Sequence, residues 1–266
     1  MMNVAILGVS GRMGQSLVHA LRESADFRLS GALASPDSAT LGRDAGEVAH
    51  GTPLAVSVTS DRRQALANAV IAIDFTLPAA LEDNLSAIEA RGIPVVIGIT
   101  GIDAARHTRI RRTSERLPVL VAPNMSLAMN LLFGLAARAA AALPADYDVE
   151  ILEAHHRQKV DAPSGTALRL GEIVAGARGG TLAAQAVDSR VGQSASRVPG
   201  TIGFASLRAG DIVGDHHVLF AGTGESLELV HRATDRMTFA AGALVAARWL
   251  VGKPPGLYGM SDVLGL

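Results

Sequence analysis

The side chains best suited to chemistry lie close together in one segment, residues 153–167. His155 and His156 are adjacent there, and Lys159 follows His155 by four positions. An imidazole titrates near neutral pH and a lysine ammonium can donate a proton, so this spacing indicates proton transfer. A Pro-Ser-Gly-Thr sequence then leads into a predicted helix over residues 166–177, whose first N–H groups suit an anion. The segment therefore predicts acid–base chemistry on a small anionic molecule.

The charged and imidazole side chains of the chain have alternative roles. We expect Asp161 to cap the predicted helix rather than to fix Lys159. Glu153, Asp161 and the two histidines could suggest a metal site, but adjacent histidines of a strand point to opposite faces, so we expect no metal. The histidines outside the segment that lie in predicted strands or turns are expected to be structural: His216, His217 and His231.

A glycine-rich loop near the N-terminus is the second candidate site. Gly8, Gly11 and Gly14 have the spacing G-x-x-G-x-x-G and lie between a predicted strand and a predicted helix. Dinucleotide folds place the cofactor pyrophosphate at such a loop, because glycines permit close backbone approach and the helix N-terminus faces the phosphates. Ser10 stands where the commoner G-x-G-x-x-G motif has a second glycine. We expect a nicotinamide cofactor here, with an ordinary glycine-rich turn as the alternative.

The end of the second predicted strand bears on the choice between NADH and NADPH. Folds that prefer NAD carry an acid about 20 residues beyond the glycine loop, where it binds the ribose hydroxyls. This sequence has Ala34 and Ser35 at that position, and the nearest acid is Asp37. Ser35 could donate to a 2′-phosphate and Arg12 could supply positive charge. The pattern favours NADPH and leaves NADH open.

Strands and helices alternate in the first half of the chain. Buried runs joined by helical connections are typical of a parallel, doubly wound sheet, whose strands end at one ligand-binding edge. At two later strand ends, Gly98 permits a bulky ring to approach and Asn124 could orient an amide; a turn glycine and a helix cap are the alternatives. The expected strands cover residues 4–7, 29–33, 54–58, 70–75, 94–97 and 119–122, and the helices cover 13–24, 78–91 and 103–116.

The pattern in the second half of the chain predicts an α+β arrangement with a largely open sheet. Gly210-Asp211 and Gly222-Thr223-Gly224 are expected turns between its last strands. The final helix, 236–251, is stopped by glycine and prolines, and its pattern does not assign it to either part. The other expected elements are a helix over 127–143, a strand over 147–156, a strand and mobile loop within 179–197, and strands over 201–207, 212–220 and 226–231.

Composition excludes several classes of function. The formal net charge of the 266 residues is −1, which gives no support to nucleic-acid or membrane-surface binding. The chain has no cysteine, which removes disulfides, thiolate metal sites and a thiol nucleophile. No window approaches the ~20 apolar residues of a membrane helix, and the N-terminus does not resemble a signal sequence. We therefore expect a cytoplasmic protein.

These segments together resemble a known family, the bacterial 4-hydroxy-tetrahydrodipicolinate reductases, also called dihydrodipicolinate reductases. The resemblance covers essentially the whole chain in order and spacing, and the histidine segment is its longest and most specific part. The departure is at Ala34-Ser35, where members often carry an acid or an arginine. The motifs are Gly8–Gly14, Ile73–Thr76, Gly98–Gly101, Glu153–Ala167, Val198–Phe204 and Arg208–Gly214.

The resemblance implies reduction of 4-hydroxy-tetrahydrodipicolinate, by way of dihydrodipicolinate, by NADH or NADPH on the diaminopimelate and lysine pathway. It implies a dinucleotide-binding domain over residues 1–126, completed by 239–266. Residues 127–238 would bind the small dicarboxylate substrate and form a homotetramer through an open sheet.

Residue roles follow from the same resemblance. His155 would be the acid–base residue and Lys159 the proton donor. The substrate would also contact His156, Gly165 and Thr166. The cofactor would be lined by Gly8, Val9, Ser10, Gly11, Arg12, Met13, Gly98, Ile99, Thr100, Ala122, Pro123, Asn124 and Met125.

Other functions remain open at this point. One is another two-domain nicotinamide oxidoreductase, acting on a small sugar or hydroxy acid. A second is a non-catalytic sensor that binds NAD(P), which would have no need of His155 or Lys159. A third is a metal-dependent hydrolase, which would lose activity with a chelator. A dehydrogenase that works through an acyl-thioester is excluded because the chain has no cysteine.

Overall fold

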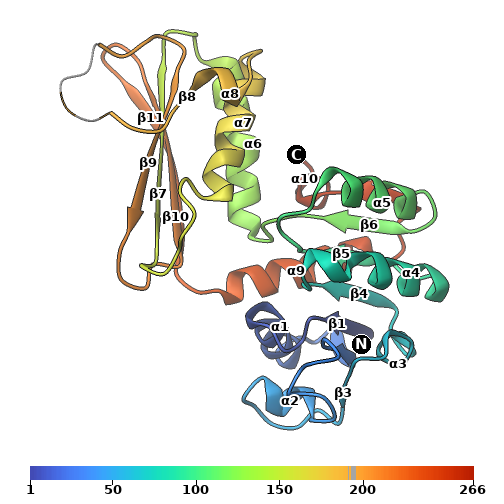
Figure 1. Cartoon of the computed structure of the whole chain (residues 1–266). Coiled ribbons are helices and arrows are strands. Elements are labelled where there is room, and N and C mark those ends of the chain that lie inside the picture. The colour runs from blue at the N-terminus through green and yellow to red at the C-terminus, as the bar shows by residue number, and fades with distance from the viewer. Residues whose placement is uncertain (191, 193–195) are drawn as a thin grey trace. The chain divides into compact units, whose positions relative to one another are not determined.

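The computed structural model describes residues 1–190, 192 and 196–266. The chain folds into two compact units, which can be followed in Figure 1. Unit 1 comprises Met1–Leu127 and Met237–Leu266, and unit 2 comprises Ala128–Arg236. The final helix that the sequence pattern left unassigned, α9 (Met237–Leu250), therefore packs in unit 1.

Unit 1 is built on a seven-stranded sheet whose paired neighbours all run parallel. Residues Val4–Leu7 and all four residues of β4 are buried, as expected for strands covered on both faces. β1 lies between β2 and β4, so β2 and β3 are added on one side of β1 and the later strands on the other. In spatial order the strands are β12 (Gly256–Tyr258), β6 (Pro118–Val121), β5 (Val95–Ile97), β4 (Ile71–Asp74), β1 (Met2–Leu7), β2 (Phe27–Leu33) and β3 (Val58–Thr59).

Two hydrophobic cores lie on the two faces of this sheet. On one face Val4 and Ile6 of β1 pack with α1, α2, α9 and α10. On the other face Leu7 and Val95 pack with α3, α4 and α5. The helices are α1 (Arg12–Arg22), α2 (Ala45–Val48), α3 (Arg62–Leu66), the short 3-10 helix η1 (Pro78–Ala80), α4 (Leu81–Arg91), α5 (Ala104–Ser114) and α10 (Met260–Leu264).

The strand predicted over 54–58 is wrong except at its last residue. The reason is Asp44, whose carboxylate accepts hydrogen bonds from the backbone N–H groups of Leu54 and Val56 at 2.9 and 3.1 Å. Ala55 between them has a positive φ of 56°, which a regular strand does not contain. A side chain therefore satisfies the backbone groups that the sheet would have used, and only Val58–Thr59 pairs with β2.

The chain after α9 adds two elements that the sequence did not predict. Gly256–Tyr258 forms β12, which pairs with β6 at the edge of the sheet, and α10 follows it. A three-residue strand is too short to show a period, and its partner lies more than a hundred positions earlier in the chain. Nonlocal pairing therefore decided this part of the fold.

Unit 2 has a five-stranded mixed sheet with α6 (Leu127–Ala142) and α7 (Gly165–Ala177) on one face, as Figure 1 shows. Val149 and Ile151 of the sheet and Leu170 of α7 belong to one core. In the predicted segment 179–197, α8 (Leu182–Gln185) precedes a two-residue strand, and residues 191 and 193–195 lie outside the described residues. The strands are β11 (Ser226–Ala233), β10 (Gly214–Ala221), β7 (Asp148–His155), β9 (Ile202–Arg208) and β8 (Ala186–Val187).

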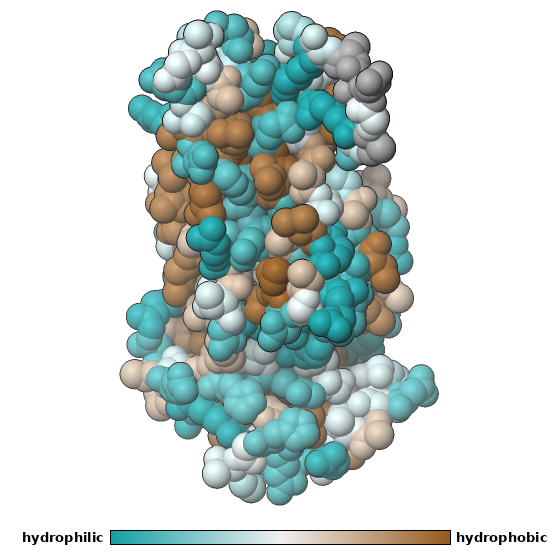
Figure 2. Space-filling model, turned by 90° about the vertical axis from the view of Figure 1, so that its left-hand side faces the viewer, coloured by the Kyte–Doolittle hydropathy of each residue, from teal (hydrophilic) through white to brown (hydrophobic). Residues whose placement is uncertain are grey.

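The opposite face of this sheet carries exposed apolar side chains. Leu207 is 59% exposed and Val230 is 45% exposed. Leu207 pairs with Ala154, and Val230 pairs with His217, so both lie on the face away from Val149 and Ile151. Figure 2 shows this side of the molecule, with apolar residues scattered among polar ones.

Candidate active site

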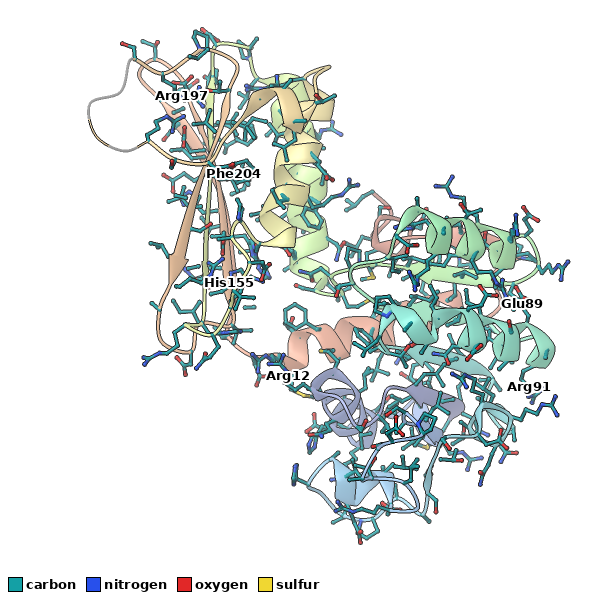
Figure 3. All side chains as sticks on the ribbon, viewed as in Figure 1. Arg12, Glu89, Arg91, His155, Arg197 and Phe204 are labelled. Carbon is teal, nitrogen blue, oxygen red and sulfur yellow. The ribbon has the colours of Figure 1, made fainter. Side chains whose placement is uncertain are left out.

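The helix-covered face of the unit 2 sheet changes from apolar to polar along β7. Side chains alternate along a strand, so Glu153 and His155 lie on the same face as Ile151. The register places His216 of β10 beside Glu153, and Arg208 of β9 beside His155. In Figure 3, Phe204 marks the apolar stretch of this sheet and His155 the polar one. We call Glu153, His155, Ser164, Arg208 and His216 the polar cluster.

Glu153 is the centre of the polar cluster. It is 2% exposed, and both of its carboxylate oxygens accept hydrogen bonds from Arg208, at 2.8 and 2.7 Å. It also accepts from the Ser164 N–H at 3.2 Å and pairs with His155 Nδ1 at 2.5 Å. Burial alone would raise the pKa of Glu153, but hydrogen bonds from Arg208, then Ser206 and His155, lower it to about 2. Glu153 is therefore an anion at neutral pH.

His155 is oriented by this carboxylate. Since a carboxylate only accepts, Nδ1 carries the proton of the neutral ring and Nε2 is left for a ligand. A Cβ on Gly214 would lie 3.1 Å from Nε2, so the glycine gives the ring room. Burial lowers the pKa of His155 below its ordinary value, and the charge of Glu153 opposes this only in part.

His216 packs behind His155. The two rings meet edge to face with centroids 5.2 Å apart, and His216 Nε2 lies 3.2 Å from Ser164 Oγ. His216 is 4% exposed, and burial, with the nearby charges of His155 and His231, lowers its pKa to about 3. It is therefore neutral at physiological pH and supports the ring of His155 without adding charge.

Lys159 lies four residues beyond His155 and pairs with Asp161. Lys159 Nζ is 2.8 Å from Asp161 Oδ1, and the lysine side chain is 20% exposed. The prediction that Asp161 caps the following helix is wrong. Ser164 is the N-cap of α7, because its hydroxyl accepts the Ala167 N–H and only it directly precedes the first helical residue, Gly165. The lysine holds the pKa of Asp161 below its usual value.

The first turn of α7 has the features of an anion site. Gly165 is exposed, and a Cβ built on it would meet nothing within 4 Å. The N–H groups of a first helical turn have no acceptor within the helix, and the helix dipole favours negative charge there. Thr166 follows in the same turn and is half-buried. His156 is half-buried too, and its Nδ1 is buried without a hydrogen-bond partner among the described residues.

Sequence reasoning missed four members of this arrangement. Glu153 was considered only as a metal ligand and His216 only as a structural residue, and Ser164 and Arg208 were assigned no role. The sequence offered one signal: the motif Arg208–Gly214 begins with a charged residue, which favours a partner of opposite charge. The structure supplies that partner, Glu153, 55 positions away.

The glycine loop of unit 1 borders a cavity of about 500 Å3 at the carboxyl ends of β1, β2 and β4. Gly8, Ser10 and Gly11 line it. Gly8 has φ +89°, which L side chains rarely adopt, and a Cβ on Gly14 would lie 2.2 Å from the Gly8 carbonyl oxygen. Gly11 leads directly into α1, so backbone N–H groups face the loop. These residues fit a bound dinucleotide.

The other predicted cofactor residues differ in how they could contact a ligand. Four of these residues have buried side chains, so only their backbone groups could contact the cofactor: Val9, Ile99, Ala122 and Met125. Arg12 is exposed at the start of α1 and Met13 is partly exposed beside it. Thr100 and Pro123 are exposed where the chain leaves β5 and β6.

Gly98 and Asn124 have local roles that the structure makes visible. A Cβ on Gly98 would lie 2.2 Å from the Phe75 ring, so the bulky ring that this glycine accommodates belongs to the protein. The Asn124 side chain accepts the Ser126 N–H at 2.9 Å, next to the start of α6. This hydrogen bond closes an Asx turn just before α6.

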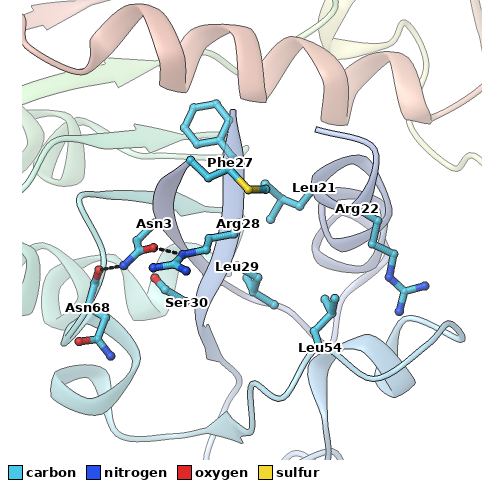
Figure 4. Close-up of a pocket in the computed structure, with 10 residues that line it drawn as sticks. Asn3, Leu21, Arg22, Phe27, Arg28, Leu29, Ser30, Leu54 and Asn68 are labelled. Carbon is cyan, nitrogen blue, oxygen red and sulfur yellow. Dashed lines mark hydrogen bonds between the residues drawn. The ribbon is translucent and has the colours of Figure 1, made fainter. Parts of the chain in front are cut away.

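A second cavity in unit 1, of about 550 Å3, lies where β1 and β2 begin (Figure 4). Asn3 bridges Asn68 and Arg28 there, with its amide donating to the Asn68 carbonyl at 2.8 Å and its oxygen accepting from Arg28 Nε at 2.5 Å. These polar groups are already paired within the protein. The cavity is therefore a weaker ligand site than the one at the carboxyl ends of the strands.

The described residues contain neither a metal-binding cluster nor a membrane-spanning helix. No group of three or more histidine, aspartate or glutamate side chains there is arranged to hold a metal ion. Among the same residues, no helix has both the length and the apolar character needed to span a bilayer.

Comparison with known proteins gives consistent matches over the whole chain. The family model described as "Dihydrodipicolinate reductase, N-terminus" matches residues 2–125, and "Dihydrodipicolinate reductase, C-terminus" matches residues 128–264. The chain is 54% identical to the 4-hydroxy-tetrahydrodipicolinate reductase of Thiobacillus denitrificans over 99% of its own length and 98% of that protein. It is 49% identical to the Nitrosomonas eutropha protein of the same name, over 100% and 99% of the two chains.

Solved structures match as well. The dipicolinate-bound dihydrodipicolinate reductase from Paenisporosarcina sp. has a TM-score of 0.80 and 26% identity, covering 98% of this chain and 99% of that one. A myo-inositol dehydrogenase from Corynebacterium glutamicum shares the fold alone, with a TM-score of 0.56 and 13% identity over 92% and 86% of the chains. The predicted doubly wound parallel sheet with a second α+β part is confirmed.

Proposed function

The chain belongs to the dihydrodipicolinate reductase family, and from this premise we propose that it reduces 4-hydroxy-tetrahydrodipicolinate, by way of dihydrodipicolinate, to tetrahydrodipicolinate. It is a nicotinamide-dependent oxidoreductase of the diaminopimelate and lysine pathway. The observation that carries this conclusion is 54% identity to a reductase of that name over 99% of the chain. The same matches favour this function over a sugar or hydroxy-acid oxidoreductase and over a non-catalytic sensor.

The substrate is proposed to bind at the start of α7. A carboxylate of the substrate would accept hydrogen bonds from the N–H groups of Gly165 and Thr166, where the helix dipole favours an anion. His156, which lies just beyond β7, is proposed to contact the same molecule. The open space beside Gly165 supports this arrangement, because nothing in unit 2 blocks the approach of a ligand to its Cα among the described residues.

Lys159 is proposed to donate the proton that completes the reduction. A nicotinamide cofactor would supply the hydride, and its transfer would move electron density toward the substrate ring nitrogen. The Lys159 ammonium can stabilise that developing charge and then protonate the nitrogen. Asp161 Oδ1 lies 2.8 Å from Lys159 Nζ and holds the lysine side chain in place.

His155 is proposed to act through Nε2 as a hydrogen-bonding and proton-exchanging group. Glu153 fixes the ring by accepting from Nδ1. Because burial lowers the pKa of His155, the free site holds a neutral imidazole near neutral pH. A dianionic substrate would favour the protonated ring, since an opposite charge nearby stabilises it. Substrate binding would thus charge the imidazole that then donates to the substrate.

The cofactor is proposed to bind along the carboxyl edge of the unit 1 sheet. Backbone N–H groups from Gly8 to Met13 would hold the pyrophosphate. The segments Gly98–Thr100 and Ala122–Met125 follow β5 and β6 on the same edge, where they would line the nicotinamide end. Both NADH and NADPH are proposed as cofactors, with NADPH favoured because Ala34 and Ser35 supply no carboxylate.

A homotetramer is proposed to form through the open face of the unit 2 sheet. Leu207 and Val230 expose apolar surface on that face, 59% and 45% respectively, and apolar surface of this kind is stabilised by burial against another chain.

The function is tested by following nicotinamide absorbance. Purified protein is mixed with NADH or NADPH and with enzymatically made 4-hydroxy-tetrahydrodipicolinate. We expect oxidation of the cofactor only when protein and substrate are both present. Failure to oxidise either cofactor, in protein that binds them, would contradict the proposed reaction.

A further inference from the structure

Arg62 is the single charged residue among those that line the cavity of about 500 Å3 in unit 1. It begins α3 and reaches the cavity together with Ser60, from the segment that follows β3. Ala34 and Ser35 line the cavity at the end of β2, where NAD-preferring folds carry a carboxylate for the ribose hydroxyls. The cavity thus presents a cation and hydroxyl groups at the place where an acid is usual.

The pairing of β2 with β3 brings these groups together. Leu33 pairs with Thr59, and the Ala34 N–H donates to the Thr59 carbonyl at 3.0 Å. Ser35 and Ser60 therefore each lie just beyond the last residues that the two strands join. Both residues border the same cavity from neighbouring strand ends.

A buried network holds the Arg62 side chain in place. Arg62 Nε donates to Asn84 Oδ1 at 2.8 Å, and Asn84 is fully buried. The Asn84 amide donates in turn to Asp74 Oδ2 at 3.0 Å and to Thr76 Oγ1 at 3.1 Å. Because the amide is fixed by the buried Asp74, its oxygen points to the arginine, and the guanidinium is oriented before any ligand arrives.

The remaining contacts leave part of the guanidinium for a ligand. Nη2 lies 3.3 Å from Asp83 Oδ2, whose side chain is 70% exposed and therefore pairs weakly. Nη1 makes no hydrogen bond within the described part of the chain, and the Arg62 side chain is 30% exposed. A planar donor group held from one side and open on the other suits a phosphate.

We propose that Arg62, with Ser35 and Ser60, binds the 2′-phosphate of NADPH and makes this chain prefer NADPH to NADH. The inference rests on the proposed function, since it takes the cavity as the seat of the adenosine end of the cofactor. The 2′-phosphate pairs with the guanidinium and accepts from the hydroxyls. NADH has only a hydroxyl at that position, which gives the cation no partner.

The experiment is calorimetric titration of NADPH and NADH into the full-length protein and its variants. In Arg62→Gln we expect NADPH binding to weaken about 10-fold or more, and NADH binding by less than about 2-fold. Arg62→Lys should recover part of the loss. Arg63→Gln, at the exposed neighbouring position of α3, is the matched control and should leave both affinities unchanged.

Two results would overturn the inference. An equal loss for both cofactors in Arg62→Gln would mean that the arginine stacks on the adenine ring instead of reading the phosphate. Unchanged binding of both would mean that it does not contact the cofactor.

A second pair of ligands separates this inference from the proposed reaction. Adenosine 2′,5′-bisphosphate and AMP differ only in the 2′-phosphate, and their binding needs no turnover. Tighter binding of the bisphosphate, lost in Arg62→Gln, supports the phosphate site even in protein that fails the reductase assay. Equal binding of the two nucleotides in protein that does reduce its substrate would overturn the phosphate site alone.

Discussion

Glu153 carries a negative charge at a position where only 2% of its surface is exposed. Such a carboxylate is stable only when its oxygens are fully paired, and here Arg208, His155 and the Ser164 N–H supply the donors. The same pairing sets the tautomer of His155. The residue that positions the imidazole therefore also joins β7, β9 and the start of α7.

Replacing Glu153 by Gln is expected to destabilise the protein in a pH-dependent way. The folded state lowers the pKa of Glu153 from 4.5 to about 2, so the ionised group stabilises the fold above pH 4.5. That contribution is lost as the pH falls from 4.5 to about 2. The difference in free energy of unfolding between wild type and Glu153→Gln should therefore shrink over this window, measured by urea unfolding at several pH values.

Glu172→Gln is the matched control, because Glu172 is 53% exposed on α7 of the same unit. Its difference from wild type is expected to be small throughout. If the gap for Glu153→Gln stayed constant with pH, the carboxylate would not be the ionised centre of the cluster.

Replacing Lys159 by Ala is expected to lower kcat by about 100-fold or more, the usual effect of removing a general acid. The affinity for NADPH should persist, because the cofactor cavity is lined by unit 1 residues and Lys159 belongs to unit 2. Steady-state kinetics and calorimetry measure the two effects. Arg157→Ala removes a nearby exposed cation and should leave kcat unchanged within about 2-fold. A Lys159→Ala enzyme with normal kcat would refute the proton-donor role.

At the scale of elements, α7 brings its N-terminus to the polar end of the β7 face. Ser164 caps the helix through its hydroxyl and at the same time donates its N–H to Glu153, so one residue ties the helix start to the sheet. Leu170 and Val174 hold the rest of the helix against the apolar part of the same face. The helix proposed to bind the anion is therefore fixed to the sheet both at its N-terminus and along its length.

Replacing Gly165 by Val is expected to raise the KM for the dicarboxylate substrate by about 10-fold, with little change in stability. The new side chain meets no protein atom within 4 Å, so it would occupy only the space proposed for the substrate. Gly176→Val is the control, since Gly176 lies in the same helix and has equally open surroundings. An unaltered KM in Gly165→Val would contradict the proposed carboxylate-binding site at the start of α7.

At the scale of the whole molecule, the two units carry different parts of the proposed reaction. Unit 1 offers the glycine loop and its cavity, and unit 2 offers the polar cluster and the start of α7. The uncovered face of the unit 2 sheet is free of these groups, since Glu153 and His155 lie on the helix-covered face. Assembly through the open face would therefore leave the site residues of each chain unblocked.

Replacing Leu207 by Glu is expected to dissociate the proposed tetramer. A carboxylate is well solvated on the open face of a single chain, but burying it in an apolar interface without a partner is strongly unfavourable. Sedimentation velocity would show smaller species. Leu257→Glu is the control, because Leu257 is 48% exposed in β12 of unit 1. A Leu207→Glu protein that sediments like wild type would place the interface elsewhere.

The amino-acid sequence by itself determined those features that depend on near neighbours. The strand–helix alternation, the glycine loop and the histidine segment each occupy a short stretch, where periodicity and spacing report backbone conformation directly. The start of α7 shows the limit of this reasoning. The helix was predicted to within one residue, but the cap was assigned to Asp161 because the choice between two nearby polar residues depends on where each side chain points.

Tertiary structure alone decided which distant groups meet. Arg208 reaches Glu153 across 55 positions, and His216 reaches Ser164 across 52. The Asp44 carboxylate accepts the backbone N–H groups of Leu54 and Val56, which keeps this segment out of the sheet. β12 pairs with β6 at the edge of the sheet. Strand register and side-chain hydrogen bonds set these contacts, and both depend on the whole folded chain instead of on a local pattern.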